Sequence, residues 1–187
     1  PTVRATVFDE AHQLNEIGVH FLGQQLSGTQ LIELTRDSLG AGLTLARGLA
    51  DWQGLAAALD RATRDWRLAV GPVRGASRLR WLGSCPESVD EASWTSAMQT
   101  VQAALEPLAV ALDSVTELVP DFVQLLQRAR NLLDSLHLFG RSAGEDRVRW
   151  LEVGTHLRLV ESPLDIADAF GKLLSPTSGA AANPVAD

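Results

Sequence analysis

The sequence is poor in several residue types: among 187 residues it has no tyrosine, one methionine, one cysteine and one lysine. With Cys85 alone, the chain can form no internal disulfide and no metal site built from several cysteines. A reducing cytoplasm is the location that we expect for such a chain. No apolar run approaches the roughly 18–20 residues that a membrane-spanning helix needs, so we expect no membrane contact.

A phosphate-binding loop is also missing. The commonest such loop is a glycine-rich turn followed by a lysine that reaches the terminal phosphates. The chain contains no Gly-x-x-x-x-Gly-Lys-[Ser/Thr] segment, and its lysine, Lys172, stands near the far end. The chain therefore lacks a complete nucleotide site, and we expect it to be unable to hydrolyse ATP by itself.

The charge is acidic overall but unevenly distributed. A formal charge of −7 argues against nonspecific nucleic-acid binding over the whole surface. Between Arg61 and Trp81, however, six arginines accompany a single acid, Asp65. A local basic stripe can bind a phosphate backbone. The alternative interpretation, a solvated helix face and loop, stays open.

Four segments show the 3–4-residue apolar spacing of amphipathic helices. The first segment covers 28–39, with Ser27 as its expected N-cap, and is followed by a glycine-rich stretch. The second covers 51–70, with Asp51 as its expected N-cap. A capping box of Ser88 and Glu91 predicts a third helix over 88–118, kinked at its internal proline. The fourth, 120–139, begins with a proline in its first turn.

Strand signals are fewer. Two β-prone runs around a glycine predict a hairpin near 147–161, and an apolar run predicts a strand over 1–8. Residues 73–84 are expected to be irregular and basic. Ser162 and Pro163 predict the start of a helix that ends near 174. We therefore expect a mainly α-helical fold, a bundle of four to six helices with a short β-hairpin and an N-terminal strand.

The N-terminal strand ends in Asp9, Glu10 and His12. A buried strand brings acids to a sheet edge in this way, where Asp can hold hydrated Mg²⁺ and Glu can orient a water molecule. The segment Val7-Phe8-Asp9-Glu10-Ala11-His12-Gln13-Leu14 resembles the Walker B element (motif II) of DEAH-type helicases. Further matches are Asp65-Trp66-Arg67-Leu68 with Arg74-Gly75, and Arg149-Trp150-Leu151-Glu152 with His156-Leu157-Arg158-Leu159 and Ser162-Pro163-Leu164-Asp165-Ile166-Ala167-Asp168-Ala169-Phe170.

In this order, the whole chain resembles the segment between motifs II and III of XPD/DinG-type superfamily 2 DNA helicases, in particular the YoaA-like branch. The resemblance implies a remnant of a motor domain with motif II (1–26), a helical arch domain (27–146), a hairpin and helix returning to the motor (147–174), and a flexible tail (175–187). It also implies an iron–sulfur cluster upstream of motif II. Since the chain starts at Pro1 and lacks motif III, we expect a piece of a longer protein.

The resemblance also implies residue roles. Asp9 would coordinate the Mg²⁺ of Mg-ATP, Glu10 would polarise the attacking water, and His12 would couple the nucleotide state to other motor motifs. The alternative is an exposed turn without chemistry. A stand-alone metal hydrolase built on the same residues ranks last, because the sequence offers no further ligand. His20, His137 and His156 stand apart from one another without zinc-site spacing.

Single-stranded DNA is the expected partner, because an arch closes over its path. The candidate contacts are the arginines of the basic stripe, which would pair with phosphates, and an aromatic ring that could stack on a base. They are Arg67, Arg74, Arg78, Arg80 and Trp81. Trp66 lies on an apolar stripe and is expected in the core. The alternative function is a helical protein-interaction module that recruits a repair or replication partner.

Overall fold

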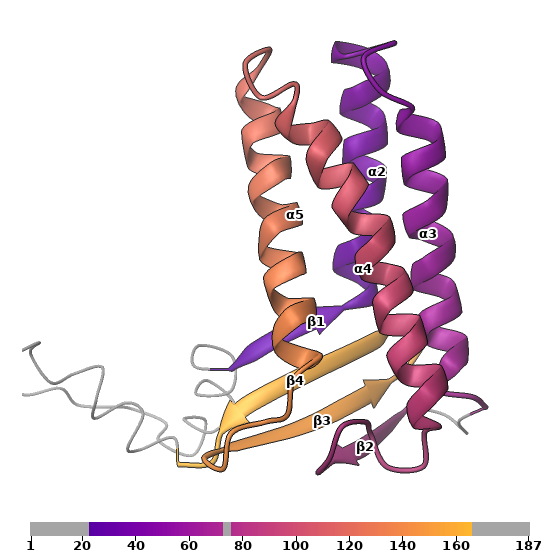
Figure 1. The fold of residues 1–187 in the computed structure, drawn as a ribbon, viewed down its shortest axis with the longest axis vertical. Coiled ribbons are helices and arrows are strands. Elements are labelled where there is room, and N and C mark those ends of the chain that lie inside the picture. The colour runs from indigo at the N-terminus through magenta and orange to yellow at the C-terminus, as the bar shows by residue number, and fades with distance from the viewer. Residues whose placement is uncertain (1–22, 73–75, 166–187) are drawn as a thin grey trace, which may run out of the picture.

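The structure, a computed structural model, describes residues 23–72 and 76–165 (Figure 1). Within these residues the chain forms four helices and four strands. In chain order they are β1 (Gln24–Ser27), α2 (Gly28–Leu45), α3 (Trp52–Ala69), β2 (Ser77–Trp81), α4 (Glu91–Asp113), α5 (Pro120–Phe139), β3 (Arg147–Val153) and β4 (Leu157–Pro163). The predicted fold class, mainly α-helical with a short β element, is confirmed. The predicted strand over 1–8 lies outside the described residues.

The strands form one antiparallel sheet in the order β1-β4-β3-β2. In Figure 1 the sheet lies across one end of the bundle formed by α2, α3, α4 and α5. The predicted hairpin is its β3–β4 pair. Gln24 of β1 lies opposite Glu161 of β4, so strands from the two ends of the described chain are neighbours. The predicted division of the chain into motor remnant, arch, returning hairpin and tail stays a prediction. The structure shows that β1 and β4, from the two ends of the described residues, pair with each other.

Local capping explains where the helices begin. The Ser27 hydroxyl accepts a hydrogen bond from the backbone N–H of Gln30, whose side chain accepts from the backbone N–H of Ser27. The carboxylate of Asp51 accepts from the backbone N–H of Gly54 at 3.0 Å. Pro120 occupies the first turn of α5. These three predicted starts are confirmed.

The predicted boundaries of the third helix were wrong. Ser88 has a positive φ of 65° and is not its cap; instead, the carboxylate of Asp90 accepts from the backbone N–H of Ser93. α4 ends at Asp113 and is followed by turns. Pro107 lies inside α4 without ending it. Proline has no backbone N–H, so the carbonyl four residues before it lacks its helical hydrogen bond. Pro107 lies on the exposed side of the helix, where water can bond that carbonyl instead.

Two further expectations are corrected in the sheet and in α2. The stretch predicted to be irregular contains β2, which pairs with β3. Ser162 and Pro163 are the last residues of β4 and do not start a helix, because the ladder with β3 continues through them. The rest of that predicted helix, from residue 166 to about 174, lies outside the described residues. α2 also continues beyond its predicted end, through Gly40 and Gly42, to Leu45. Glycine is needed at position 42 for packing, since the Trp52 ring occupies the space that a side chain would fill.

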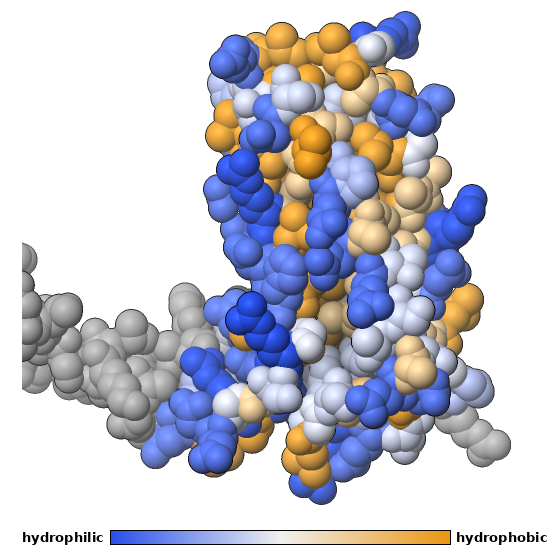
Figure 2. Space-filling view, in the orientation of Figure 1, coloured by the Kyte–Doolittle hydropathy of each residue, from blue (hydrophilic) through white to orange (hydrophobic). Residues whose placement is uncertain are grey.

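The apolar end of the bundle lies away from the sheet. Figure 2 shows hydrophobic residues gathered at this end and hydrophilic residues around the sheet. Leu45, Leu49, Leu118 and Val123, which we call the bundle tip, are each at least 46% exposed. They come from the end of α2, the loop after it, the turn between α4 and α5, and the start of α5. Beneath the surface, Trp52 and Phe122 stack with ring centroids 6.1 Å apart.

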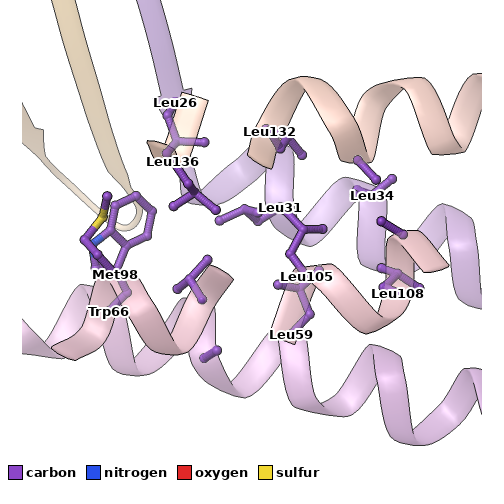
Figure 3. Close-up of a cluster of buried hydrophobic side chains, with 14 of the residues drawn as sticks. Leu26, Leu31, Leu34, Leu59, Trp66, Met98, Leu105, Leu108, Leu132 and Leu136 are labelled. Atoms are coloured by element: carbon purple, nitrogen blue, oxygen red, sulfur yellow. The ribbon is translucent and has the colours of Figure 1, made fainter. Parts of the chain in front are cut away.

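A continuous hydrophobic core joins the four helices to one face of the sheet. Leu26 of β1 and Leu136 of α5 meet at the sheet end of the bundle, and Trp66 lies beside Met98 (Figure 3). Trp66 is completely buried, as predicted. The core therefore decides which side of each strand faces the helices.

A buried ion pair links the sheet to the end of α5. Arg149 of β3 is 5% exposed and Glu161 of β4 4%. The Nε of Arg149 donates to a carboxylate oxygen of Glu161 at 2.6 Å, and its two Nη groups donate to the carbonyls of Leu138, Phe139 and Arg141. These carbonyls lie at the negative end of the α5 dipole, where a cation is stabilised.

Replacement of Gly42 by alanine should destabilise the chain although alanine favours helices. A Cβ at Gly42 would lie 2.2 Å from a ring carbon of Trp52, and such overpacking costs about 1–3 kcal/mol. At Gly40, in the same helix, nothing lies within 4 Å of the new Cβ. Gly40→Ala should therefore stabilise by about 0.5–1 kcal/mol. Urea unfolding of both variants measures the difference, and similar effects would contradict the assigned packing.

Arg149→Met should lower the free energy of unfolding by about 3–5 kcal/mol, because it leaves the Glu161 carboxylate buried without its partner. The double variant with Glu161→Leu should lose less than the sum of the single variants. Arg130→Met is the control: its pair with Asp113 is exposed on both sides, so the loss should be below about 1 kcal/mol. Equal losses at both arginines in urea unfolding would contradict a buried anchor.

Candidate nucleic-acid interface

Side chains of β2 alternate between the two faces of the sheet. Leu79 and Trp81 point toward the helices, with Trp81 in the core cluster and Leu79 packed against it. The exposed side chains of Arg78 and Arg80 lie on the opposite face. Two of the predicted DNA-binding arginines are therefore brought to one side of the sheet, away from the bundle.

The strand register adds residues from β3 and β4 to this face. Arg78 lies opposite Glu152 and Arg80 opposite Trp150, while Glu152 in turn lies opposite Arg158 of β4. These five residues, which we call the arginine face, come from three adjacent strands. Arg80 is exposed and has no ion-pair partner among the described residues.

Glu152 is the centre of the contacts on the arginine face. One of its carboxylate oxygens accepts from Nη2 of Arg78 and from Nε1 of Trp150, each at 2.9 Å. The other oxygen lies 3.5 Å from Nη1 of Arg158. The guanidinium carbon of Arg78 also lies 4.9 Å from the centre of the Trp150 ring, a cation–π contact.

These contacts set the ionisation of Glu152. Partial burial raises the pKa of Glu152, but hydrogen bonds from Trp150 and Arg78 and the charge of Arg158 outweigh it. The net result is a pKa below the usual value of a glutamate. Glu152 is therefore an anion at neutral pH, held between two cations.

A pocket of about 570 Å³ adjoins the arginine face. Its walls combine the start of α2, the start of β2 and the β3–β4 turn. Polar groups in the wall are the side chains of Ser27, Thr29, Ser77, Arg78, Glu152, His156 and Arg158. The pocket thus places two arginines and the positive end of a helix dipole around one space, together with the single carboxylate of Glu152, so the positive groups outnumber the negative one.

Trp81 is not on the arginine face, which corrects the prediction that its ring could stack on a base. It is 2% exposed and packs edge-on against Trp94, with ring centroids 5.4 Å apart. Its Nε1 donates to the carbonyl of Gly83. The aromatic residue beside the arginines is Trp150 instead. The alternation Ser-Arg-Leu-Arg-Trp could have revealed this in the sequence, had residues 77–81 been interpreted as a strand.

The other predicted site residues divide into two groups. Arg67 donates from Nε to the carbonyl of Gly154 at 2.9 Å and from Nη1 to that of Gly71, so it ties α3 to the β3–β4 turn. Arg74, Asp9, Glu10 and His12 lie outside the described residues. In the part of the chain that the structure describes, no group of three or more His, Cys, Asp or Glu residues could hold a metal ion.

The sheet is basic and the bundle acidic. The four strands carry five arginines and two glutamates, whereas the four described helices carry nine acids and six arginines. Arg149 and Glu161 are buried and cancel each other. The positive charge left on the strands is therefore concentrated at the sheet end of an acidic chain.

Fold and charge together define an α-helical bundle on a small antiparallel sheet whose outer face suits a phosphate-bearing ligand. The chain is 28% identical over 193 aligned positions to the ATP-dependent DNA helicase YoaA of Escherichia coli (strain K12), covering 96% of this chain and 27% of that protein. It is 25% identical to the ATP-dependent DNA helicase YoaA of Haemophilus influenzae, covering 96% of this chain and 28% of that protein. The predicted resemblance to YoaA-like helicases is thereby confirmed.

The chain spans just over a quarter of the length of these curated relatives. No family model matches it. None of the described helices combines the length and the apolar character that crossing a membrane requires.

Glu152→Gln should lower stability by about 1 kcal/mol at pH 7, a small loss because Arg78 and Arg158 are exposed. The pKa of Glu152 is lowered on folding, so its ionised form stabilises the fold above the unfolded value of about 4.5. This contribution disappears as pH falls through the lower, folded pKa. The stability difference between parent and variant should therefore shrink from about pH 5 downward. Urea unfolding at several pH values measures it, and a constant difference would contradict the assigned ionisation.

Proposed function

We propose that this chain is the helical insertion, or arch, of an ATP-dependent DNA helicase, and that its arginine face binds single-stranded DNA. The observation that carries the proposal is the grouping of Arg78, Arg80, Arg158 and Trp150 on the side of the sheet away from the bundle. Both curated relatives are ATP-dependent DNA helicases by name. The proposed role is to guide the single strand while ATP hydrolysis elsewhere separates the duplex.

The topology supports an insertion. β1 near one end of the described chain pairs with β4 near the other, with Leu26 opposite Leu159 and Ser27 opposite Arg158. A segment that leaves a parent domain and returns to it must bring its two ends together, and here the sheet does so. The four helices between β1 and β3 project from that sheet (Figure 1). Such a column can stand over a DNA path while its base stays attached.

The chemistry of the arginine face fits a single strand better than a duplex. Arginines bind phosphate oxygens through a planar pair of donors, and stacking of a base on an aromatic ring is possible only where bases are unpaired. Trp150 provides such a ring, and Arg78, Arg80 and Arg158 lie on the strands around it. Neither interaction depends on the base sequence. Such sequence-independent binding is what a helicase that moves along DNA requires.

The ATP-dependent part of the proposal concerns residues outside the described ranges. We propose that Asp9 holds the Mg²⁺ of Mg-ATP, that Glu10 orients the attacking water and that His12 links the nucleotide state to the motor. The support is the motif II-like segment together with the relatives. Since the chain has no phosphate loop, turnover requires residues that it does not contain.

A protein-interaction module is the second candidate. The names of the relatives do not favour it. Its support is the bundle tip, whose four large apolar side chains are exposed at the end of the bundle where Figure 2 shows hydrophobic residues gathered. The bundle tip and the arginine face lie at opposite ends of the column, so one function does not exclude the other.

Arg78→Ala combined with Arg80→Ala should weaken binding of a fluorescein-labelled oligothymidylate by at least about tenfold at low salt, because two arginines no longer pair with phosphates. The slope of log K against log salt should become shallower by about 0.7 for each phosphate that is no longer neutralised. Fluorescence anisotropy over a salt series measures both quantities.

Arg61→Ala combined with Arg64→Ala is the matched control. Both residues are exposed on α3, and the change in net charge is the same. The control should bind nearly as well as the parent chain. Equal weakening in both double variants would mean that only the overall charge matters, and would contradict a binding face on the sheet.

A further inference from the structure

We propose that Glu152 is an internal competitor of the DNA backbone: its carboxylate occupies the position of a phosphate on the arginine face, and a phosphate of the bound strand displaces it. The inference rests on the proposed function, since it needs single-stranded DNA as the ligand of this face. It adds a specific residue that sets the affinity and marks where one phosphate binds.

The contacts of Glu152 are those that a phosphate would make. Its two oxygens lie between the guanidinium groups of Arg78, at 2.9 Å, and Arg158, at 3.5 Å. The indole N–H of Trp150 donates to the oxygen that Arg78 binds. Because arginine binds carboxylates and phosphates with the same planar arrangement of donors, the two anions can replace one another here.

Solvent exposure makes this replacement possible. The side chains of Arg78 and Arg158 are 66% and 46% exposed, and that of Glu152 is 32% exposed. Exposed ion pairs are weak because water competes for both partners. The other glutamate of the sheet, Glu161, is buried with Arg149 and cannot exchange in this way. Of the two glutamates in the described strands, Glu161 is therefore held permanently by Arg149, whereas the contacts of Glu152 with Arg78 and Arg158 are exchangeable.

The displacement would also uncover a stacking surface. Arg78 lies over the Trp150 ring while it donates to Glu152. If Arg78 shifts with the phosphate that has displaced Glu152, the ring face beneath Arg78 becomes free for a base. The pocket beside Arg78 and Arg158 offers space for the incoming group. A single exchange of anions would therefore create both the phosphate contact and the base contact.

The test compares Glu152→Gln with the parent chain in oligothymidylate binding by fluorescence anisotropy. Glutamine keeps the size of the side chain but removes its charge, so the charges of Arg78 and Arg158 are no longer neutralised, although Arg158 keeps its hydrogen bonds to the neutral side chain of Gln25. Binding should tighten by about three- to tenfold, and the salt slope should become steeper by about 0.7 for each additional phosphate that the arginines neutralise. This tightening should disappear when Arg78→Ala and Arg158→Ala are added, because the released arginines are its source.

Glu106→Gln is the matched control. Glu106 is exposed on α4, bonded to Gln102, and its substitution changes the net charge equally. It should leave the affinity close to that of the parent chain. A similar increase in affinity in both variants would overturn the inference, since the effect would then come from net charge alone.

The outcomes separate this inference from the proposed function. If the parent chain binds DNA and Glu152→Gln binds equally or more weakly, the competitor role is wrong while the proposed function stands. If neither chain binds DNA at low salt, both are wrong. Tighter binding by the variant that depends on Arg78 and Arg158 supports both.

Discussion

The buried contact between Arg149 and Glu161 is the constraint on which the arrangement of the chain depends. It joins β3, β4 and the C-terminal turn of α5 through one guanidinium group. A buried guanidinium must keep its hydrogen-bond partners, because an unpaired charge in the core is far more costly than any local distortion. The contact therefore holds the sheet in one orientation against the bundle.

That orientation also decides the chemistry of the outer face. Successive residues of a strand point to opposite sides, so an inward Arg149 requires an outward Trp150, and an inward Leu151 an outward Glu152. A shift of β3 by one residue would exchange the two sets. The arginine face is thus a direct consequence of how the core is packed.

Burial gives two similar ion pairs different properties. Arg149 and Glu161 are shielded from water and serve the fold, whereas Glu152 shares its charge with two arginines that water can reach. The same residue types therefore produce a fixed anchor on one side of the sheet and an exchangeable contact on the other. The proposed DNA-binding role uses only the exchangeable side.

Much of the helical structure could be predicted from the sequence because helix signals are local. Ser27, Asp51 and Pro120 act on backbone groups within one turn, and all three predicted starts were right. The third helix was misplaced because two capping residues, Ser88 and Asp90, competed, and only the backbone conformation distinguishes them. The motif II-like segment indicated a family resemblance, but it could not predict how the residues of a binding site are arranged in space.

The sequence by itself determined the helical bundle, the β3–β4 hairpin and the presence of arginines near β2. Only the tertiary structure decided that β2 and β1 are strands, that Trp81 is buried, and that Trp150 and Glu152 stand beside Arg78. The physical reason is the range of the interactions. A helix completes its hydrogen bonds within four residues, whereas β2 finds its partner some seventy residues away, and its faces acquire their roles only when that partner is in place.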